Sequence, residues 1–158
     1  MADARFQDGD DAPLRLIAQD AEGLGIFSAL LQDAVFPITE MTFARGRRFA
    51  LMLNRFRWED RMAAEAQGRP YERVRSLLVF ENVHAVRSSG IDRGQPATIL
   101  SLLRITFTPG GEEGAGLVEL ILSGDGALQL EVETVEAQLN DVTRPYTAPS
   151  RHLPQHRD

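Results

Sequence analysis

The residues with the clearest potential for chemistry form one polar stretch near the middle of the chain, Arg87-Ser88-Ser89-Gly90-Ile91-Asp92-Arg93. Its hydroxyls, the backbone N–H groups near the glycine and the two flanking guanidinium groups could together surround an anion. Binding residues are often carried by loops that leave a strand. The alternative is an ordinary turn, in which Asp92 pairs with a neighbouring arginine or caps the turn.

A second candidate combines Arg55 with Trp58, at the point where a predicted strand ends. An indole ring beside a guanidinium group could stack against an aromatic ring or a base of a ligand. In the alternative interpretation, Trp58 covers the edge of the core, and Arg55 or Arg57 pairs with an acidic side chain. The sequence leaves both interpretations open.

Other residue types that carry catalysis are missing or isolated. All 17 basic residues of the chain are Arg, and the chain contains no Cys. A lysine Schiff base, a thiolate nucleophile and a cysteine zinc site are therefore excluded. His84 has no accompanying serine triad or metal-ligand pattern, and the other two histidines, His152 and His156, lie near the C-terminus. We expect no catalytic residues, no metal site and no cofactor.

The formal net charge of −6 is unevenly distributed along the chain. Residues 45–104 carry twelve Arg against six acidic residues, whereas residues 1–44 carry two against eight and residues 105–158 three against nine. The basic middle could form an anion-binding face, or the acidic flanking segments could neutralise it in the fold. We favour neutralisation. We do not expect nucleic-acid binding, because nucleic-acid-binding domains are usually basic overall.

The sequence contains no sign of membrane insertion or export. No apolar run approaches the ~20 residues that a membrane-spanning helix needs, so no membrane association is expected. The N-terminus, Met1-Ala2-Asp3-Ala4-Arg5, lacks the basic and apolar regions of a signal peptide. Because neither signal is found, we expect a cytoplasmic location, and the absence of cysteine fits it.

The hydrophobic pattern predicts one domain built from short elements. Residues 1–12 are expected to be a disordered lead, residues 13–142 a single α+β domain, and residues 143–158 a flexible tail that contains prolines. A helix is predicted over about 21–33, capped at its start by Asp20. The other predicted elements are a strand over about 14–18, a hairpin of strands 37–44 and 48–57, a loop over 59–73 that has room for one helical turn at 60–66, strands over 77–81, 83–87 and 99–107, a hairpin of strands 117–122 and 128–132, and a short helix over 133–141.

Hairpin connections dominate this pattern, so the sheet is expected to be largely antiparallel, with about seven strands. An N-terminal helix and a short C-terminal helix complete an α+β fold. The strand count and the terminal helix match a partly open, pleckstrin-homology-like barrel. This analogy concerns the fold alone and carries no function.

Four segments carry a resemblance to a known family: Leu30-Leu31-Gln32-Asp33-Ala34-Val35, residues 47–59, residues 83–93 and Leu130-Glu131-Val132-Glu133. Across roughly residues 14–142, the chain resembles the bacterial domain-of-unknown-function family DUF2948. The resemblance implies a small stand-alone bacterial protein. It implies no activity, cofactor or catalytic residue.

These observations favour a non-catalytic binding or protein-interaction module, which forms a homo-oligomer or binds a protein partner. The alternative is a small-molecule binding protein or small enzyme that holds an anionic metabolite in the Arg87–Arg93 loop. Convergence of this loop and Arg55 on one concave pocket would favour the alternative.

Overall fold

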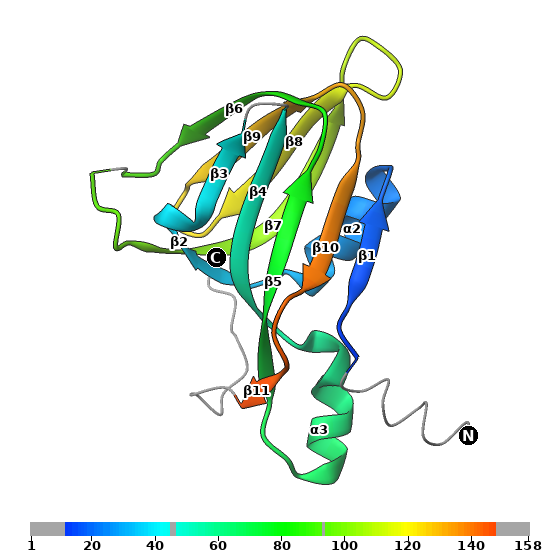
Figure 1. Ribbon diagram of the computed structural model, residues 1–158, viewed down its shortest axis with the longest axis vertical. Coiled ribbons are helices and arrows are strands. Elements are labelled where there is room, and N and C mark those ends of the chain that lie inside the picture. Colours follow the sequence, from blue (N-terminus) through cyan, green and yellow to red (C-terminus); the bar gives the residue numbers. More distant parts are fainter. Residues whose placement is uncertain (1–11, 45–46, 93, 148–158) are drawn as a thin grey trace.

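The computed structural model describes residues 12–44, 47–92 and 94–147 (Figure 1). Arg45 and Gly46 of the predicted first hairpin turn lie outside the described residues, as does Arg93 of the predicted anion-binding loop. Residues 1–11 of the predicted lead and residues 148–158 of the predicted tail also lie outside them.

The described strands form one antiparallel sheet, which confirms the predicted α+β class with a largely antiparallel sheet. The strands are β1 (Arg15–Ala18), β2 (Val35–Pro37), β3 (Met41–Ala44), β4 (Arg48–Phe56), β5 (Glu72–Phe80), β6 (Val83–Ser89), β7 (Ile99–Pro109), β8 (Gly116–Leu122), β9 (Ala127–Val132), β10 (Ala137–Asp141) and β11 (Tyr146–Thr147). Their order in the sheet is β1-β10-β5-β4-β2-β7-β8-β9-β6, with β3 also beside β4 and β11 also beside β5.

The prediction of about seven strands is wrong, because the described part of the chain forms an 11-stranded sheet. The additional strands β2, β10 and β11 have only two to five residues, too few to show a clear alternation in the sequence. The sheet is open, with β1 and β6 at its two ends. A seven-stranded, pleckstrin-homology-like barrel therefore does not describe it.

The predicted C-terminal helix over 133–141 is also wrong, because β10 occupies its second half. Leu139 of β10 lies opposite Leu78 of β5 on one side and opposite Leu16 of β1 on the other. Over so few residues, helical and strand periodicities both fit the apolar positions. Pairing with two strands that are distant in sequence decides between them, because it satisfies the backbone of β10 along both edges.

The predicted N-terminal helix is confirmed in part. Helix α2 covers Ala21–Leu30, and the Asp20 carboxylate accepts a hydrogen bond of 2.8 Å from the N–H of Gly23 at its start. A Cβ atom at Gly23 would lie 2.9 Å from the Cβ atom of Ala18, so glycine allows α2 to pack closely on β1. The helix ends earlier than predicted, and Asp33 adopts a left-handed conformation with φ of 64° beyond it.

The predicted loop over 59–73 contains two short helical elements. The 3-10 helix η2 (Trp58–Asp60) leads directly into α3 (Arg61–Gln67), which lies at the end of the sheet where β5 begins (Figure 1). Gly68 ends α3 with φ of 65°, a conformation that glycine adopts without strain. Another 3-10 helix, η1 (Ile38–Glu40), separates β2 from β3.

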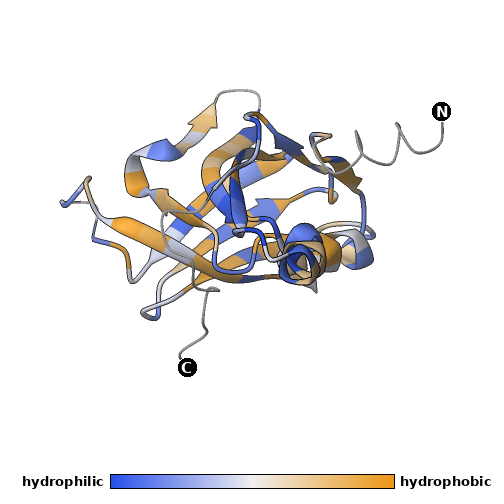
Figure 2. Ribbon diagram, turned by 90° about the horizontal axis from the view of Figure 1, so that it is seen from below, coloured by the Kyte–Doolittle hydropathy of each residue, from blue (hydrophilic) through white to orange (hydrophobic). Residues whose placement is uncertain are grey.

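The sheet curls into two layers around the core. In Figure 1, β3, β4, β5 and β10 lie in front of β7, β8 and β9, and α2 lies beside β1. Apolar and polar residues alternate along the strands, as Figure 2 shows, so each layer turns an apolar side inward. The hydroxyl of Ser28 in α2 accepts a hydrogen bond of 2.9 Å from the N–H of Ile105 in β7. The largest fully buried apolar side chains are Phe27, Phe36, Phe49, Phe56, Phe80, Leu24, Leu31, Leu51, Leu53, Leu78 and Leu102.

Candidate functional site

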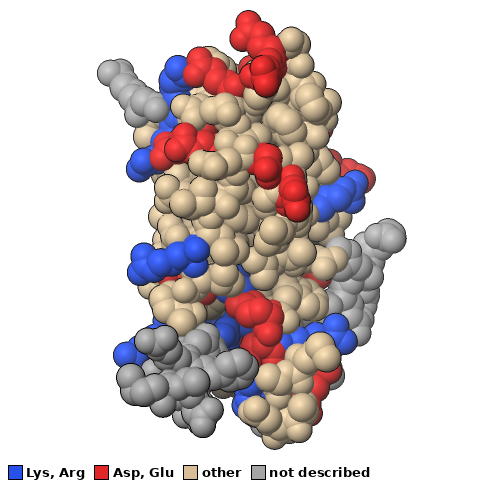
Figure 3. All heavy atoms as spheres, turned by 90° about the vertical axis from the view of Figure 1, so that its right-hand side faces the viewer, with Lys and Arg blue, Asp and Glu red and all other residues tan. Residues whose placement is uncertain are grey.

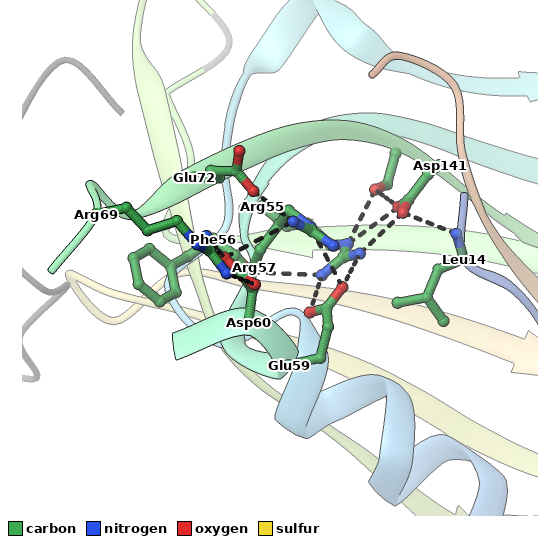
Figure 4. Close-up of polar contacts among 10 residues, drawn as sticks. Leu14, Arg55, Phe56, Arg57, Glu59, Asp60, Arg69, Glu72 and Asp141 are labelled. Carbon is green, nitrogen blue, oxygen red and sulfur yellow. Dashed lines mark hydrogen bonds and ion pairs between the residues drawn. The ribbon is translucent and has the colours of Figure 1, made fainter. Parts of the chain in front are cut away.

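Arg55 lies near the end of β4 and is 0% exposed. Its guanidinium group donates hydrogen bonds of 3.1 and 3.0 Å to the two carboxylate oxygens of Asp141 in β10. On another side it donates bonds of 2.9 and 2.8 Å to the carboxylate of Glu59, and one of 3.2 Å to the hydroxyl of Ser76 (Figure 4). Arg55 therefore joins β4, β5, β10 and η2 and does not reach solvent.

The charges in this cluster hold one another in their ionised forms. Burial by itself would raise the pKa of Asp141, but hydrogen bonds from Arg55, Ser76 and the Leu14 N–H outweigh it and leave that pKa below its ordinary value. Burial would likewise lower the pKa of Arg55, and the carboxylates of Glu59 and Asp141 instead keep it above its ordinary value.

A second ion-pair cluster adjoins the first at the start of α3. Arg57 pairs with Glu72, and Arg69 donates two hydrogen bonds of 2.7 Å to Asp60 (Figure 4). The hydrogen bonds from Arg69 are the main reason why the pKa of Asp60 lies below its ordinary value. Because Asp60 is only 5% exposed, this cluster fixes η2 and α3 against the sheet rather than presenting a charged surface.

Acid is expected to destabilise the fold through Asp60 and Asp141. Both pKa values are depressed in the folded state. Their contribution to stability is therefore complete above the unfolded-state pKa of about 3.9 and is lost as the pH falls through the folded-state values. We expect the free energy of unfolding in urea to decrease below about pH 4. The decrease should be shallower in Asp60→Asn, which binds no proton at this position. An equally steep decrease in that variant would show that Asp60 does not contribute.

The side chain of Trp58 is held by contacts within the fold. Its indole N–H donates a hydrogen bond of 3.0 Å to the backbone carbonyl of Gln32, and its ring centroid lies 4.6 Å from that of Phe56. The side chain therefore connects η2 to the segment that follows α2. This environment matches the alternative in which Trp58 covers the edge of the core.

The structure places Arg87, Ser88 and Ser89 within β6 rather than in a loop. Ser88 and Ser89 pair with Leu128 and Ala127 of β9, so their backbones belong to the sheet ladder. The guanidinium group of Arg87 lies 3.6 Å from the carboxylate of Glu131 on the same strand pair. The loop begins only after these three residues.

The predicted site residues do not converge. In the register of β4 and β5, Arg55 lies opposite Val74, whereas β6 starts only after the end of β5 at Phe80. A strand rises about 3.3 Å per residue, so roughly 20 Å separates Arg55 from the end of β5 that leads into β6. Since Arg55 is also fully buried, it does not share an open pocket with Arg87.

Some arginines in the basic middle of the chain pair with acidic residues of the flanking segments. Arg47 pairs with Glu133 at 2.6 Å, and Arg55 and Arg87 pair with acidic residues of β10 and β9. On the face that carries α2 and β1, acidic and basic groups are scattered around a large uncharged area (Figure 3). This pairing supports neutralisation over a continuous anion-binding face.

An apolar groove of about 380 Å³ lies between β3 and β6, and its lining includes Phe43, Phe49, Val86 and Leu128. Phe43 lies opposite the buried Phe49 in the β3–β4 pair. Residues that lie opposite each other in a strand pair share a face of the sheet, so Phe43 is on the core side. It is nevertheless 47% exposed, because the groove opens above it.

One family model matches residues 14–156, which include all eleven described strands and both α-helices. The chain belongs to the DUF2948 family. The description of this family is "Protein of unknown function (DUF2948)", so membership in it does not assign an activity to the chain. Comparison with the curated proteins and with the solved structures gives no match.

The described residues of this DUF2948 chain contain no group of three or more His, Cys, Asp or Glu side chains that could hold a metal ion. None of the helices within these residues is long and apolar enough to cross a membrane.

Sequence reasoning did not single out Phe43 or Val86 as candidate site residues. Met41 and Phe43 alternate with polar or small neighbours, a pattern that indicates a strand with one apolar side. No local signal shows that this side is left uncovered. The groove exists because β3 pairs with β4, whereas β6 pairs with β9 in the other layer.

Proposed function

We propose that this DUF2948 protein is a non-catalytic protein-interaction module, which binds an extended apolar segment of a partner protein in the groove between β3 and β6. The observation that carries the proposal is the exposure of Phe43, an aromatic side chain on the core side of β3 that the described elements cover only in part. Exposed apolar surface of this kind is characteristic of binding sites.

Unpaired strand edges on both sides of the groove support strand addition as the binding mode. Among the described strands, β3 pairs only with β4, and β6 pairs only with β9. The other edge of each strand therefore carries N–H and C=O groups that no described strand satisfies. An extended segment of another protein satisfies such groups by adding a strand to the sheet.

The chemistry of the groove favours apolar side chains in the partner. Side chains of an added strand alternate between its two faces, so every second one would enter the groove. There they would contact Phe43 and Val86, and the described lining contains no charged side chain. A charged partner residue would lose its hydration without gaining an ion pair, which is unfavourable.

The alternative function, anionic-metabolite binding by the Arg87–Arg93 loop, has less support. Arg87 already pairs with Glu131, and Ser88 and Ser89 are part of β6. A cytoplasmic location stays a prediction from the sequence.

Peptides selected from a random library for binding to the full chain would test the proposal. Phe43→Asp places a charge in the groove and is expected to weaken a selected peptide at least about 30-fold, because a central interface residue often contributes ~2 kcal/mol. Ile17→Asp is the matched control. Ile17 is 68% exposed on β1, at the opposite end of the sheet from β6, and its substitution should leave affinity unchanged. Fluorescence anisotropy of labelled peptide measures both affinities.

Amide NMR shifts locate the bound peptide. We expect peptide-induced shifts along β3 and β6. Shifts confined to β1, or equal affinities of Phe43→Asp and the unchanged protein, would contradict the proposal. If Phe43→Asp instead converts a dimer into a monomer in size-exclusion chromatography, the groove binds a second copy of this chain and not a different partner.

A further inference from the structure

Three arginines differ from the others in the described part of the chain. Arg15, Arg104 and Arg144 have neither an ion pair nor a side-chain hydrogen bond to another described residue. The other described arginines have carboxylate or amide partners, such as Glu131 for Arg87 and Asn54 for Arg73. Arginines without an internal partner keep their full capacity to bind an external anion.

Two of these three arginines line the same pocket. Arg15 in β1 and Arg144 after β10 line a pocket of about 820 Å³. Glu72 at the start of β5 also lines this pocket, whereas Phe49 of the apolar groove lies opposite Phe80 at the other end of β5. The two segments meet because Leu14 donates its N–H to Asp141, whose own N–H donates to the Leu14 carbonyl. The pairing of β1 with β10 therefore brings both arginines to one pocket.

The two carboxylates that border this pocket already have arginine partners. Asp141 pairs with Arg55 at 3.0 Å, and Glu72 pairs with Arg57. These carboxylates are therefore engaged with arginines of the neighbouring clusters, whereas Arg15 and Arg144 have no ion-pair partner among the described residues.

Thr143 adds a neutral hydrogen-bond donor to the same wall. Its hydroxyl oxygen accepts a hydrogen bond of 3.1 Å from the N–H of Arg75, and no described group accepts the hydroxyl hydrogen. Two guanidinium groups and a hydroxyl donor match the acceptor oxygens of a phosphate or a carboxylate.

We propose that the pocket lined by Arg15, Thr143 and Arg144 binds the phosphate or carboxylate group of a small anionic ligand. This site is separate from the β3–β6 groove and does not depend on peptide binding there. Like the anion site predicted in the Arg87–Arg93 loop, it would bind an anion through arginine and hydroxyl groups. Its residues, however, come from β1 and from the segment after β10.

Amide NMR titrations of the full chain with inorganic phosphate and, separately, with succinate test this site at low ionic strength. We expect saturable shifts at Val142, Thr143 and Arg144. Arg15→Ala and Arg144→Ala should each weaken binding at least about tenfold, because each removes charge-assisted hydrogen bonds. Arg104→Ala changes the net charge equally but lies outside the pocket, so it should bind like the unchanged protein.

The outcomes are distinct. Tighter binding of phosphate identifies a phosphorylated ligand, and tighter binding of succinate identifies a carboxylate ligand. Shifts that do not saturate with either anion would overturn the proposal. It would also be overturned if Arg104→Ala weakened binding as much as Arg15→Ala, because the effect would then reflect net charge alone. Peptide binding to the groove would be unaffected in each case.

Discussion

Arg55→Met is expected to lower the free energy of unfolding by about 3–5 kcal/mol, as is typical when one partner of a buried ion pair is removed. The substitution keeps much of the apolar stem but leaves the carboxylate of Asp141 buried without its cation. It also removes the bidentate contact with Glu59. Chemical unfolding in urea, followed by circular dichroism, measures the loss.

Two further variants separate the ion pair from the packing of the side chain. Arg104→Met removes an exposed arginine without a partner among the described residues and should change stability by no more than about 0.5 kcal/mol. The double variant Arg55→Met with Asp141→Asn should be more stable than Arg55→Met alone. Leu14 and Ser76 bond to different oxygens of Asp141, so the amide oxygen of Asn keeps the hydrogen bond from Leu14, and the amide NH2 donates to the Ser76 hydroxyl instead. No unpaired negative charge then stays buried at this position. If the double variant is less stable than the single one, the buried charge is not the cause of the loss.

Leu139→Ala is expected to cost about 2–5 kcal/mol of unfolding free energy, as is usual for truncating a buried leucine. Leu139 is 0% exposed in β10, between Leu16 and Leu78 of the two neighbouring strands. The truncation leaves a cavity at the join between these strands. Urea unfolding monitored by tryptophan fluorescence measures the change, because Trp58 is the only tryptophan in the chain.

Gln138→Ala is the matched control for this prediction. Gln138 is the neighbour of Leu139 in β10, and successive side chains of a strand point to opposite faces of the sheet. Its substitution should cost much less than that of Leu139. Equal losses would contradict a strand at Ala137–Asp141 and would favour the helical alternative.

The elements that were correctly predicted depend on contacts between neighbours in sequence. The hairpin of β8 and β9 turns through Gly124 and Asp125, which adopt φ of 78° and 67°, and glycine and aspartate signal such conformations directly. The start of α2 depends on Asp20 and the N–H of Gly23, three positions away. In each case, the interacting residues lie within a few positions of one another in the sequence, so the sequence shows them directly.

The candidate sites depend on contacts that no local signal encodes. Arg55 binds Asp141, which lies 86 positions further along the chain, and Arg15 and Arg144 reach one pocket only through the pairing of β1 with β10. Scattered arginines and acids in a sequence allow many pairings. The register of the sheet selects one of them.

By itself, the sequence determined the absence of lysine and cysteine chemistry, the antiparallel character of the sheet, and the turns and helix start that are stabilised within a few residues. Only the tertiary structure decided that residues 137–141 form a strand, that the predicted anion loop is partly β6, and that Phe43 faces an open groove. The physical reason is that a short segment takes the conformation that satisfies its backbone and buries its apolar side chains. Both depend on which distant strands lie beside it.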